Sequence, residues 1–267
     1  MGLKGTGAAG YPTSNADRGG ERVLRRTGRR SEMETMRLRL PVVTMDGPAG
    51  SGKTTVSRIL AAKLGMVVVD TGLFYRAVAW VMAQQGLDPS DENQAAEAAR
   101  SLRLEIQPDA EQGNGQRVLV NGEEVNGKLY TPEVEKIVSD VARHPEVRRV
   151  LLPKQRETLR AGGVVVAGRD TGTVVWPQAE MKVYLDASAE VRARRKHLEK
   201  QTGDGESDYE RVLSLMQNRD RIDSGRKTAP LRVPDSALVI DTDSFTAEEV
   251  AEQILAAYRR LPAAEAR

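Results

Sequence analysis

Residues 47–54, which read GPAGSGKT, limit the possible folds more than any other segment of the sequence. They match the pattern G-x-x-x-x-G-K-[ST] and stand between an apolar run, 40–45, and a segment, 53–64, with apolar residues at helical spacing. Glycines there let backbone N–H groups converge on phosphate oxygens, and the start of the helix adds partial positive charge. The segment therefore predicts a phosphate-binding loop between a buried strand and a helix.

Side chains in such a loop have definite chemical tasks. Lys53 can reach the β- and γ-phosphates of a nucleoside triphosphate, and the hydroxyl of Thr54 can bind Mg²⁺. The loop alone does not separate a kinase from a GTPase, a motor or a remodelling ATPase. However, the sequence has neither an Asn-Lys-x-Asp motif for guanine nor an apolar strand that ends in Asp-Glu. The predicted ATP site consists of Gly47, Pro48, Ala49, Gly50, Ser51, Gly52, Lys53, Thr54 and Thr55.

Short apolar runs alternate with helical patterns over much of the chain, which is typical of an α/β domain with a parallel sheet. The predicted strands are 40–45, 66–70, 164–167, 181–186 and 237–241. The predicted helices are 53–64, 72–85, 188–200, with Ser188 as its cap, and 246–261, with a capping box of Thr246 and Glu249. Arg219, Asp223 and Arg226 are spaced i, i+4 and i+7, so on a continuous helix they would share one face.

The segment 87–162 interrupts this alternation. Ser90 is expected to cap a helix that runs to Ser101, and strands are predicted at 102–107 and 117–120 with a hairpin turn at Asn121-Gly122. Thr131-Pro132 begins another helix. We interpret 87–162 as a lobe inserted into a core formed by 37–86 and 163–262, with a polar flap near 201–208 and a short tail at 263–267.

The basic residues of the first 36 positions explain the high isoelectric point of 8.8. That stretch has seven basic and four acidic residues, which leaves 33 basic and 34 acidic residues in the rest of the chain. It has too few apolar residues to form a core, so we expect a disordered basic extension and no nucleic-acid partner. The sequence has no cysteine, which excludes thiolate catalysis and thiolate metal sites. The apolar runs are too short to span a membrane, so we expect no membrane partner. We also expect a cytoplasmic, monomeric protein.

Arginines at loops and helix ends suggest that the chain binds more phosphate than one nucleotide carries, because the guanidinium fork suits phosphate. They are Arg76, Arg148, Arg169, Arg192, Arg194, Arg195, Arg219 and Arg226. Four stretches, 42–76, 120–156, 168–195 and 218–231, moreover resemble bacterial cytidylate kinases in the same order. The resemblance covers about 37–261. It implies a three-layer P-loop kinase fold with a mostly parallel five-stranded sheet, an inserted nucleoside-monophosphate-binding lobe and a short lid at about 192–208.

The resemblance also implies transfer of a phosphoryl group from Mg²⁺-bound ATP to CMP or dCMP, in pyrimidine nucleotide metabolism. In it Arg76, Arg169 and Arg226 hold the acceptor phosphate. Thr71, Arg148 and Asp170 surround the cytosine, and Ser139, Arg219 and Asp223 contact the ribose. Lys53, Arg169, Arg192 and Arg195 are the expected catalytic residues. A carboxylate such as Asp170 accepts a hydrogen bond from the cytosine amino group and repels the corresponding uracil oxygen.

Two positions depart from the family pattern. Ala167 stands where the family has an aspartate, and Tyr130 stands where it has an arginine. Loss of the aspartate removes a carboxylate that could orient a substrate-binding arginine, so we expect weaker binding of CMP. Two alternatives stay open at this point: another small-molecule P-loop kinase, such as a UMP or shikimate kinase, or a nucleotide-regulated protein that binds nucleic acid through its basic extension.

Overall fold

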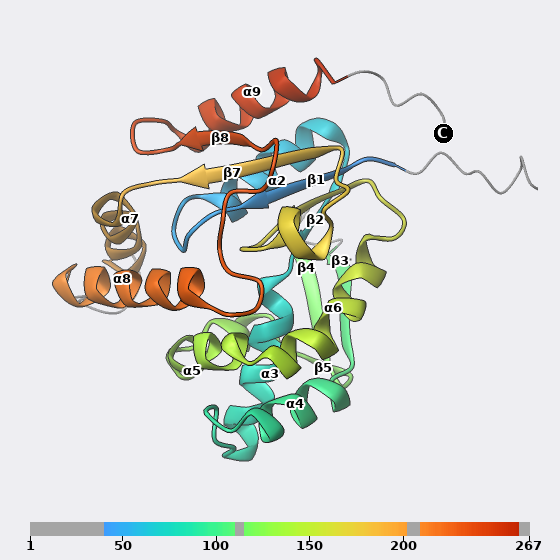
Figure 1. Cartoon of the computed structure of the whole chain (residues 1–267), viewed down its shortest axis with the longest axis vertical. Helices are drawn as coiled ribbons and strands as arrows, with labels where there is room; N and C mark the ends of the chain where they lie inside the picture. Colours follow the sequence, from blue (N-terminus) through green and yellow to red (C-terminus); the bar gives the residue numbers. More distant parts are fainter. Residues whose placement is uncertain (1–39, 110–114, 202–208, 262–267) are drawn as a thin grey trace, which may run out of the picture. The chain divides into compact units, whose positions relative to one another are not determined.

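A parallel sheet of five strands forms the centre of the computed structural model, which describes residues 40–109, 115–201 and 209–261. The order of strands is β2-β6-β1-β7-β8, and each neighbouring pair is parallel (Figure 1). The strands are β1 (Val42–Asp46), β2 (Val67–Asp70), β6 (Val164–Ala167), β7 (Met181–Asp186) and β8 (Leu238–Asp241). The prediction of a five-stranded parallel sheet is confirmed, although β1 begins two residues later than predicted because Leu40 is exposed.

Helices cover both faces of this sheet and give the fold its three layers. On one face Val43 and Met45 of β1 pack with Leu60 of α2. On the other face Val42 of β1 packs with Leu159 of α6. Both faces of β1 are thus buried, as expected for a central strand of a parallel sheet. The covering helices are α2 (Lys53–Leu64) and α9 (Ala247–Tyr258) on the first face and α6 (Pro145–Leu159) on the second.

A separate hydrophobic cluster joins α3 to the segment that follows it. Phe74 and Met82 of α3 are fully buried in it together with Leu129 and Leu151. In Figure 1 this group lies below the five-stranded sheet. Its elements are α3 (Gly72–Gln85), α4 (Glu92–Ser101), β3 (Leu104–Asp109), β4 (Gly115–Val120), β5 (Glu123–Glu124), η1 (Gly127–Tyr130) and α5 (Pro132–Arg143), together with the first half of α6. The strands β3, β4 and β5 form a small antiparallel sheet.

Most of the turns and helix caps predicted for this region are confirmed. Asn121 and Gly122 both have positive φ and turn β4 into β5, as a hairpin of this kind requires. Thr131 caps α5. The predicted cap of α4 was wrong: Asp91, and not Ser90, accepts hydrogen bonds from the N–H groups of Asn93 and Gln94.

The last part of the chain adds three helices around the sheet. Helix α7 (Ala189–Gln201) packs on α8 (Tyr209–Gly225) through Ala193, Val212 and Met216. The predicted capping box of Thr246 and Glu249 begins α9, which ends at Tyr258 rather than near 261. The predicted extension 1–36, most of the flap 201–208 and the tail 263–267 lie outside the described residues. Within the described ranges, every helix is too short or too polar to span a bilayer.

Candidate active site

The phosphate-binding loop follows the carboxyl end of β1 and leads into α2. Gly47, Gly50 and Gly52 all have positive φ, which side chains rarely tolerate. A Cβ atom on Gly47 would lie 2.1 Å from the carbonyl oxygen of Leu185, so this position leaves no room for a side chain. The backbone conformation of the loop therefore requires glycine at these positions. The predicted order of strand, loop and helix is confirmed.

Lys53 is the buried cation of this loop. Its ammonium group donates to the carbonyl oxygen of Pro48 at 2.5 Å and to Oγ of Ser51 at 3.3 Å. Burial holds the pKa of Lys53 well below its ordinary value, and the positive charge of Arg169 lowers it further. An anion bound beside this ammonium would favour its charged form. Thr54 and Thr55, in contrast, are exposed at the start of α2.

Two arginines of α7 hold the outer side of the loop. Arg192 is buried and donates to the carbonyl oxygens of Ala187 and Ala49, and its remaining nitrogen lies 2.6 Å from Asp220 of α8. Arg195 donates to Oγ1 and to the carbonyl oxygen of Thr242. Thr242 in turn donates to the carbonyl oxygen of Ser51 at 3.5 Å, so Arg192 contacts the loop directly and Arg195 contacts it through Thr242. These contacts engage three of the five N–H donors of Arg192.

The carboxyl end of β6 carries Arg169 and Asp170 beside the loop, because β6 is the neighbour of β1. Asp170 is buried and accepts a hydrogen bond from Arg148 of α6, with 2.6 Å between Oδ2 and Nη2. Arg148 also donates to the carbonyl oxygen of Ala142 and lies 5.0 Å from the ring centre of Tyr75. The sheet and α6 thus bring together two residues that the resemblance assigns to the cytosine.

A second buried ion-pair group lies at the end of α8. Asp223 accepts from Arg169 at 3.1 Å and from Arg226 at 3.3 Å. Burial acts to raise the pKa of Asp223, but the two arginines outweigh it and hold that pKa below its usual value. Arg226 follows the end of α8 at Gly225, so Arg219, Asp223 and Arg226 do not all lie on one continuous helix. Arg226 nevertheless contacts Asp223, and it also donates to the carbonyl oxygen of Ala229.

A third group links α3, α5 and α8. Glu135 of α5 lies 2.8 Å from Nη2 of Arg76 and 3.6 Å from Nη1 of Arg219. The guanidinium of Arg76 also donates to the carbonyl oxygen of Leu129 and stacks over the ring of Tyr130, 4.6 Å from its centre. Tyr130, at one of the two departures from the family pattern, therefore packs on an arginine assigned to the acceptor phosphate.

Two remaining predicted residues frame this region. Thr71 is buried and donates from its hydroxyl to the carbonyl oxygen of Ala167 at 3.0 Å. Ser139 is partly buried on α5. At Ala167 the family carboxylate is missing, but Asp223 already holds the guanidinium of Arg169, so orientation of that arginine has another source.

The arginines of this region exceed the carboxylates that pair with them. Three carboxylates, those of Glu135, Asp170 and Asp223, face the five arginines Arg76, Arg148, Arg169, Arg219 and Arg226. The buried Nε atoms of Arg148, Arg219 and Arg226 have no hydrogen-bond partner among the described residues. Burial together with the neighbouring Arg169 lowers the pKa of Arg219 to about 10. Such an excess of buried donors and positive charge fits a polyanionic ligand.

Sequence reasoning missed one buried carboxylate, Asp46, at the end of β1. It accepts hydrogen bonds from N and Oγ1 of Thr171 and from N of Gly172, at 2.7, 2.8 and 2.7 Å. Burial raises its pKa to about 6, against these hydrogen bonds. Thr171 and Gly172 begin η2 (Thr171–Val175), a short π-helical turn that follows Asp170 directly. The sequence feature that could have indicated it is a single acidic residue at the end of a mostly apolar strand.

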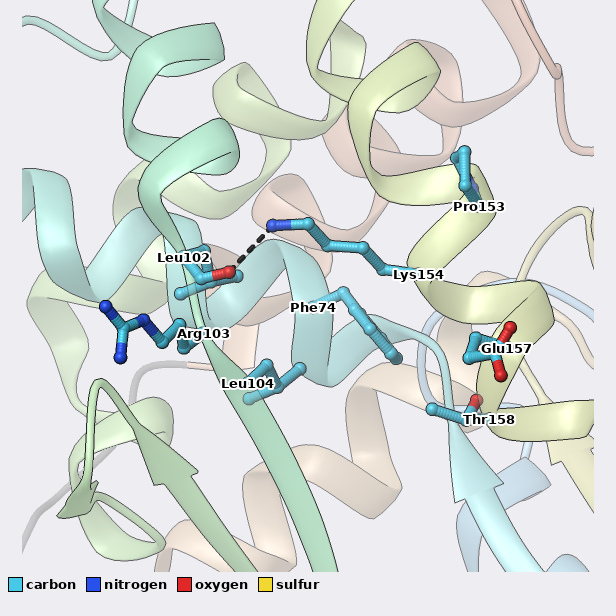
Figure 2. Close-up of a pocket in the computed structure, with 8 residues that line it drawn as sticks. All are labelled: Phe74, Leu102, Arg103, Leu104, Pro153, Lys154, Glu157 and Thr158. Atoms are coloured by element: carbon cyan, nitrogen blue, oxygen red, sulfur yellow. Dashed lines mark hydrogen bonds between the residues drawn. The ribbon is translucent and has the colours of Figure 1, made fainter.

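The cavity drawn in Figure 2 lies away from these groups, between α3, α6 and the start of β3. It measures about 450 Å³ and is lined by residues such as Phe74, Leu104 and Lys154. The ammonium of Lys154 donates to three carbonyl oxygens at the end of α4, those of Ala99, Arg100 and Leu102. Lys154 therefore caps the carboxyl end of α4. None of the predicted site residues lines this cavity.

The model of the family described as cytidylate kinase matches residues 43–260 of the chain. A cytidylate kinase of Geobacillus thermodenitrificans is 44% identical over 213 residues, which are 80% of this chain and 94% of that protein. A cytidylate kinase of Caldanaerobacter subterraneus is 41% identical over 218 residues, which are 82% of this chain and 94% of that protein. With a phosphate-binding loop, an arginine-rich site beside it and these similarities over most of its length, the chain belongs to the cytidylate kinase family.

Proposed function

We infer that this chain transfers the γ-phosphoryl group of ATP to CMP or dCMP, which yields ADP and CDP or dCDP. The observation that carries the inference is the arginine-rich site beside the phosphate-binding loop. Five arginines face three carboxylates there, an excess of two positive charges. A phosphate monoester near neutral pH carries a charge of about −1.5 to −2, which matches that excess.

The site needs no general base for this reaction. The attacking atom would be an oxygen of the acceptor phosphate, whose second pKa is about 6, so it is already largely deprotonated at neutral pH. What the chain must supply is alignment and neutralisation of charge on the transferring group. We propose Lys53 and Arg169 for that task, because both lie where the loop and the end of β6 meet. Arg192 and Arg195 are proposed to join them.

The residues proposed to hold the acceptor lie on the helices α3, α5, α6 and α8 and in the turns before α3, after β6 and after α8. Arg76, Arg169 and Arg226 would bind its phosphate, and Ser139, Arg219 and Asp223 its ribose. Thr71, Arg148 and Asp170 would recognise the base. Asp170 can accept from the amino group of cytosine, whereas the oxygen that uracil presents there would be repelled by its carboxylate.

ATP would lie along 47–55, with its phosphates over the backbone N–H groups of the loop. The exposed hydroxyl of Thr54 is the proposed ligand for Mg²⁺, which would neutralise phosphate charge. The described residues contain no group of three or more His, Cys, Asp or Glu that could hold a metal ion. We therefore propose that the metal arrives with ATP. We further propose a cytoplasmic role in pyrimidine nucleotide metabolism, a monomeric chain, an acceptor-binding lobe at 87–162 and a lid at about 192–208.

An ATP-consumption assay with CMP, dCMP, UMP, AMP and shikimate tests the proposal. We expect turnover with CMP and dCMP well above that with the other three, and loss of it in a Lys53→Met control. Turnover with none of the five would refute the proposal. Preference for shikimate or UMP would favour the other small-molecule kinases that the loop alone allows.

A further inference from the structure

We propose that Glu135 is a built-in competitor of the acceptor's phosphate, which must displace its carboxylate from Arg76 in order to bind. The inference rests on the proposed function. It assigns to Glu135 control over the affinity for the acceptor, a role beyond the site residues named above.

The contacts of Glu135 resemble those of a phosphate group. One carboxylate oxygen, Oε1, lies 2.8 Å from Nη2 of Arg76, and the other, Oε2, lies 3.6 Å from Nη1 of Arg219. These arginines come from α3 and α8, and the carboxylate from α5 joins them across the site. The oxygen of Glu135 next to Arg76 therefore occupies a position that an oxygen of a bound phosphate would take on this arginine.

Charge favours this arrangement. Burial acts to raise the pKa of Glu135, but Arg76 and Arg219 outweigh it and hold that pKa below its usual value. Glu135 is therefore ionised at neutral pH. An incoming phosphate adds a second anion next to its carboxylate, and two anions that share the same cations repel each other.

Arg76 does not need Glu135 to hold its orientation. Its Nη1 donates to the carbonyl oxygen of Leu129 at 3.0 Å, and its guanidinium stacks on Tyr130. With the carboxylate removed, these two contacts still fix the side chain, while Nη2 becomes free to donate to the acceptor. A structural role for Glu135 would predict the opposite result, namely an arginine that loses its place and a weaker site.

The test compares Glu135→Gln with a matched control, Glu133→Gln, in the full chain. Both residues lie in the first turn of α5, but Glu133 is exposed. We expect Glu135→Gln to lower KM for CMP by roughly threefold to tenfold, from the usual range of partly exposed ion pairs, with kcat changed less than twofold. Glu133→Gln should leave both constants unchanged. An unchanged or raised KM in Glu135→Gln would overturn the proposal.

A binding experiment separates this proposal from the proposed function. The affinities for CMP and for cytidine are measured by calorimetry, in the wild type, in Glu135→Gln and in a second variant, Glu135→Ser. If Glu135 competes with phosphate, the variants bind CMP more tightly and cytidine as the wild type does. A gain for both ligands, or for neither, refutes competition. Failure of the wild type to turn over CMP would refute the proposed function instead.

Discussion

Asp46 provides the sharpest prediction about the stability of this fold, through the substitution Asp46→Asn. The carboxylate is fully buried, and its pKa in the folded protein is about 6, against an ordinary value of 3.8. Because the folded state holds the proton more tightly, the contribution of Asp46 to stability is complete below about pH 4. It is lost as the pH rises to about 6, where the buried group becomes charged.

The size of the effect follows from the pKa difference. A shift from 3.8 to about 6 corresponds to about 3 kcal/mol in the free energy of unfolding, at about 1.4 kcal/mol for each pKa unit. Asparagine cannot ionise, so this dependence disappears in the variant. Its amide oxygen can replace one carboxylate oxygen, but its amino group would face a backbone N–H such as that of Gly172, which costs about 1–3 kcal/mol.

Urea unfolding at several pH values between 4 and 7 measures the effect, followed by tryptophan fluorescence. We expect the stability of Asp46→Asn relative to the wild type to rise by about 2.5 kcal/mol from pH 4 to pH 7, because Asp46 in the unfolded chain is already partly ionised at pH 4. Titrating groups that do not interact with Asp46 contribute equally to both proteins and cancel in the difference. Two curves that stay parallel over this range would show that Asp46 does not titrate as its burial requires.

Three further outcomes are expected. Asp170→Asn should reduce the preference for CMP over UMP in kcat/KM by roughly tenfold to a hundredfold, because it removes the charge that repels the uracil oxygen; an unchanged ratio would exclude that role. Gly47→Ala should lower the melting temperature and ATP affinity more than Gly65→Ala, which shares a positive φ but meets no atom within 4 Å; equal effects would contradict the steric argument. Residues 37–267 alone should keep the kcat/KM of the full chain, whereas lost activity would implicate the basic extension.

Features encoded by neighbouring residues were predictable from the sequence. The loop 47–54 and the capping box of Thr246 and Glu249 each depend on a few adjacent positions, and both occur as predicted. Where two adjacent residues could serve, the prediction failed: Ser90 and Asp91 can both cap a helix, and the structure uses Asp91. Sequence spacing also could not show that the chain leaves α8 before Arg226.

Contacts between distant segments explain what sequence reasoning missed at the candidate site. Glu135 reads as an ordinary acid in the first turn of a helix, and only the packing of α5 against α3 and α8 brings it to two arginines. Asp46 likewise accepts its hydrogen bonds from residues such as Thr171, which lies 125 positions away in the sequence. The arginines were predictable as a group because the family pattern marks them, but their pairing with particular carboxylates was not.

The pairing of β1 with β6 divides the site into a fixed part and an adjustable part. Met45 lies opposite Ala167 in the parallel ladder, so backbone hydrogen bonds set the separation between the loop after β1 and Arg169 and Asp170 after β6. Arg76, Arg148 and Glu135 instead stand on helices whose positions depend on side-chain packing. Substitutions that loosen this packing should therefore change which acceptor is bound and how tightly, while the separation between the phosphate-binding loop and Arg169 stays the same. Substitutions on these helices can therefore alter the selectivity for the acceptor without changing the residues proposed to transfer the phosphoryl group.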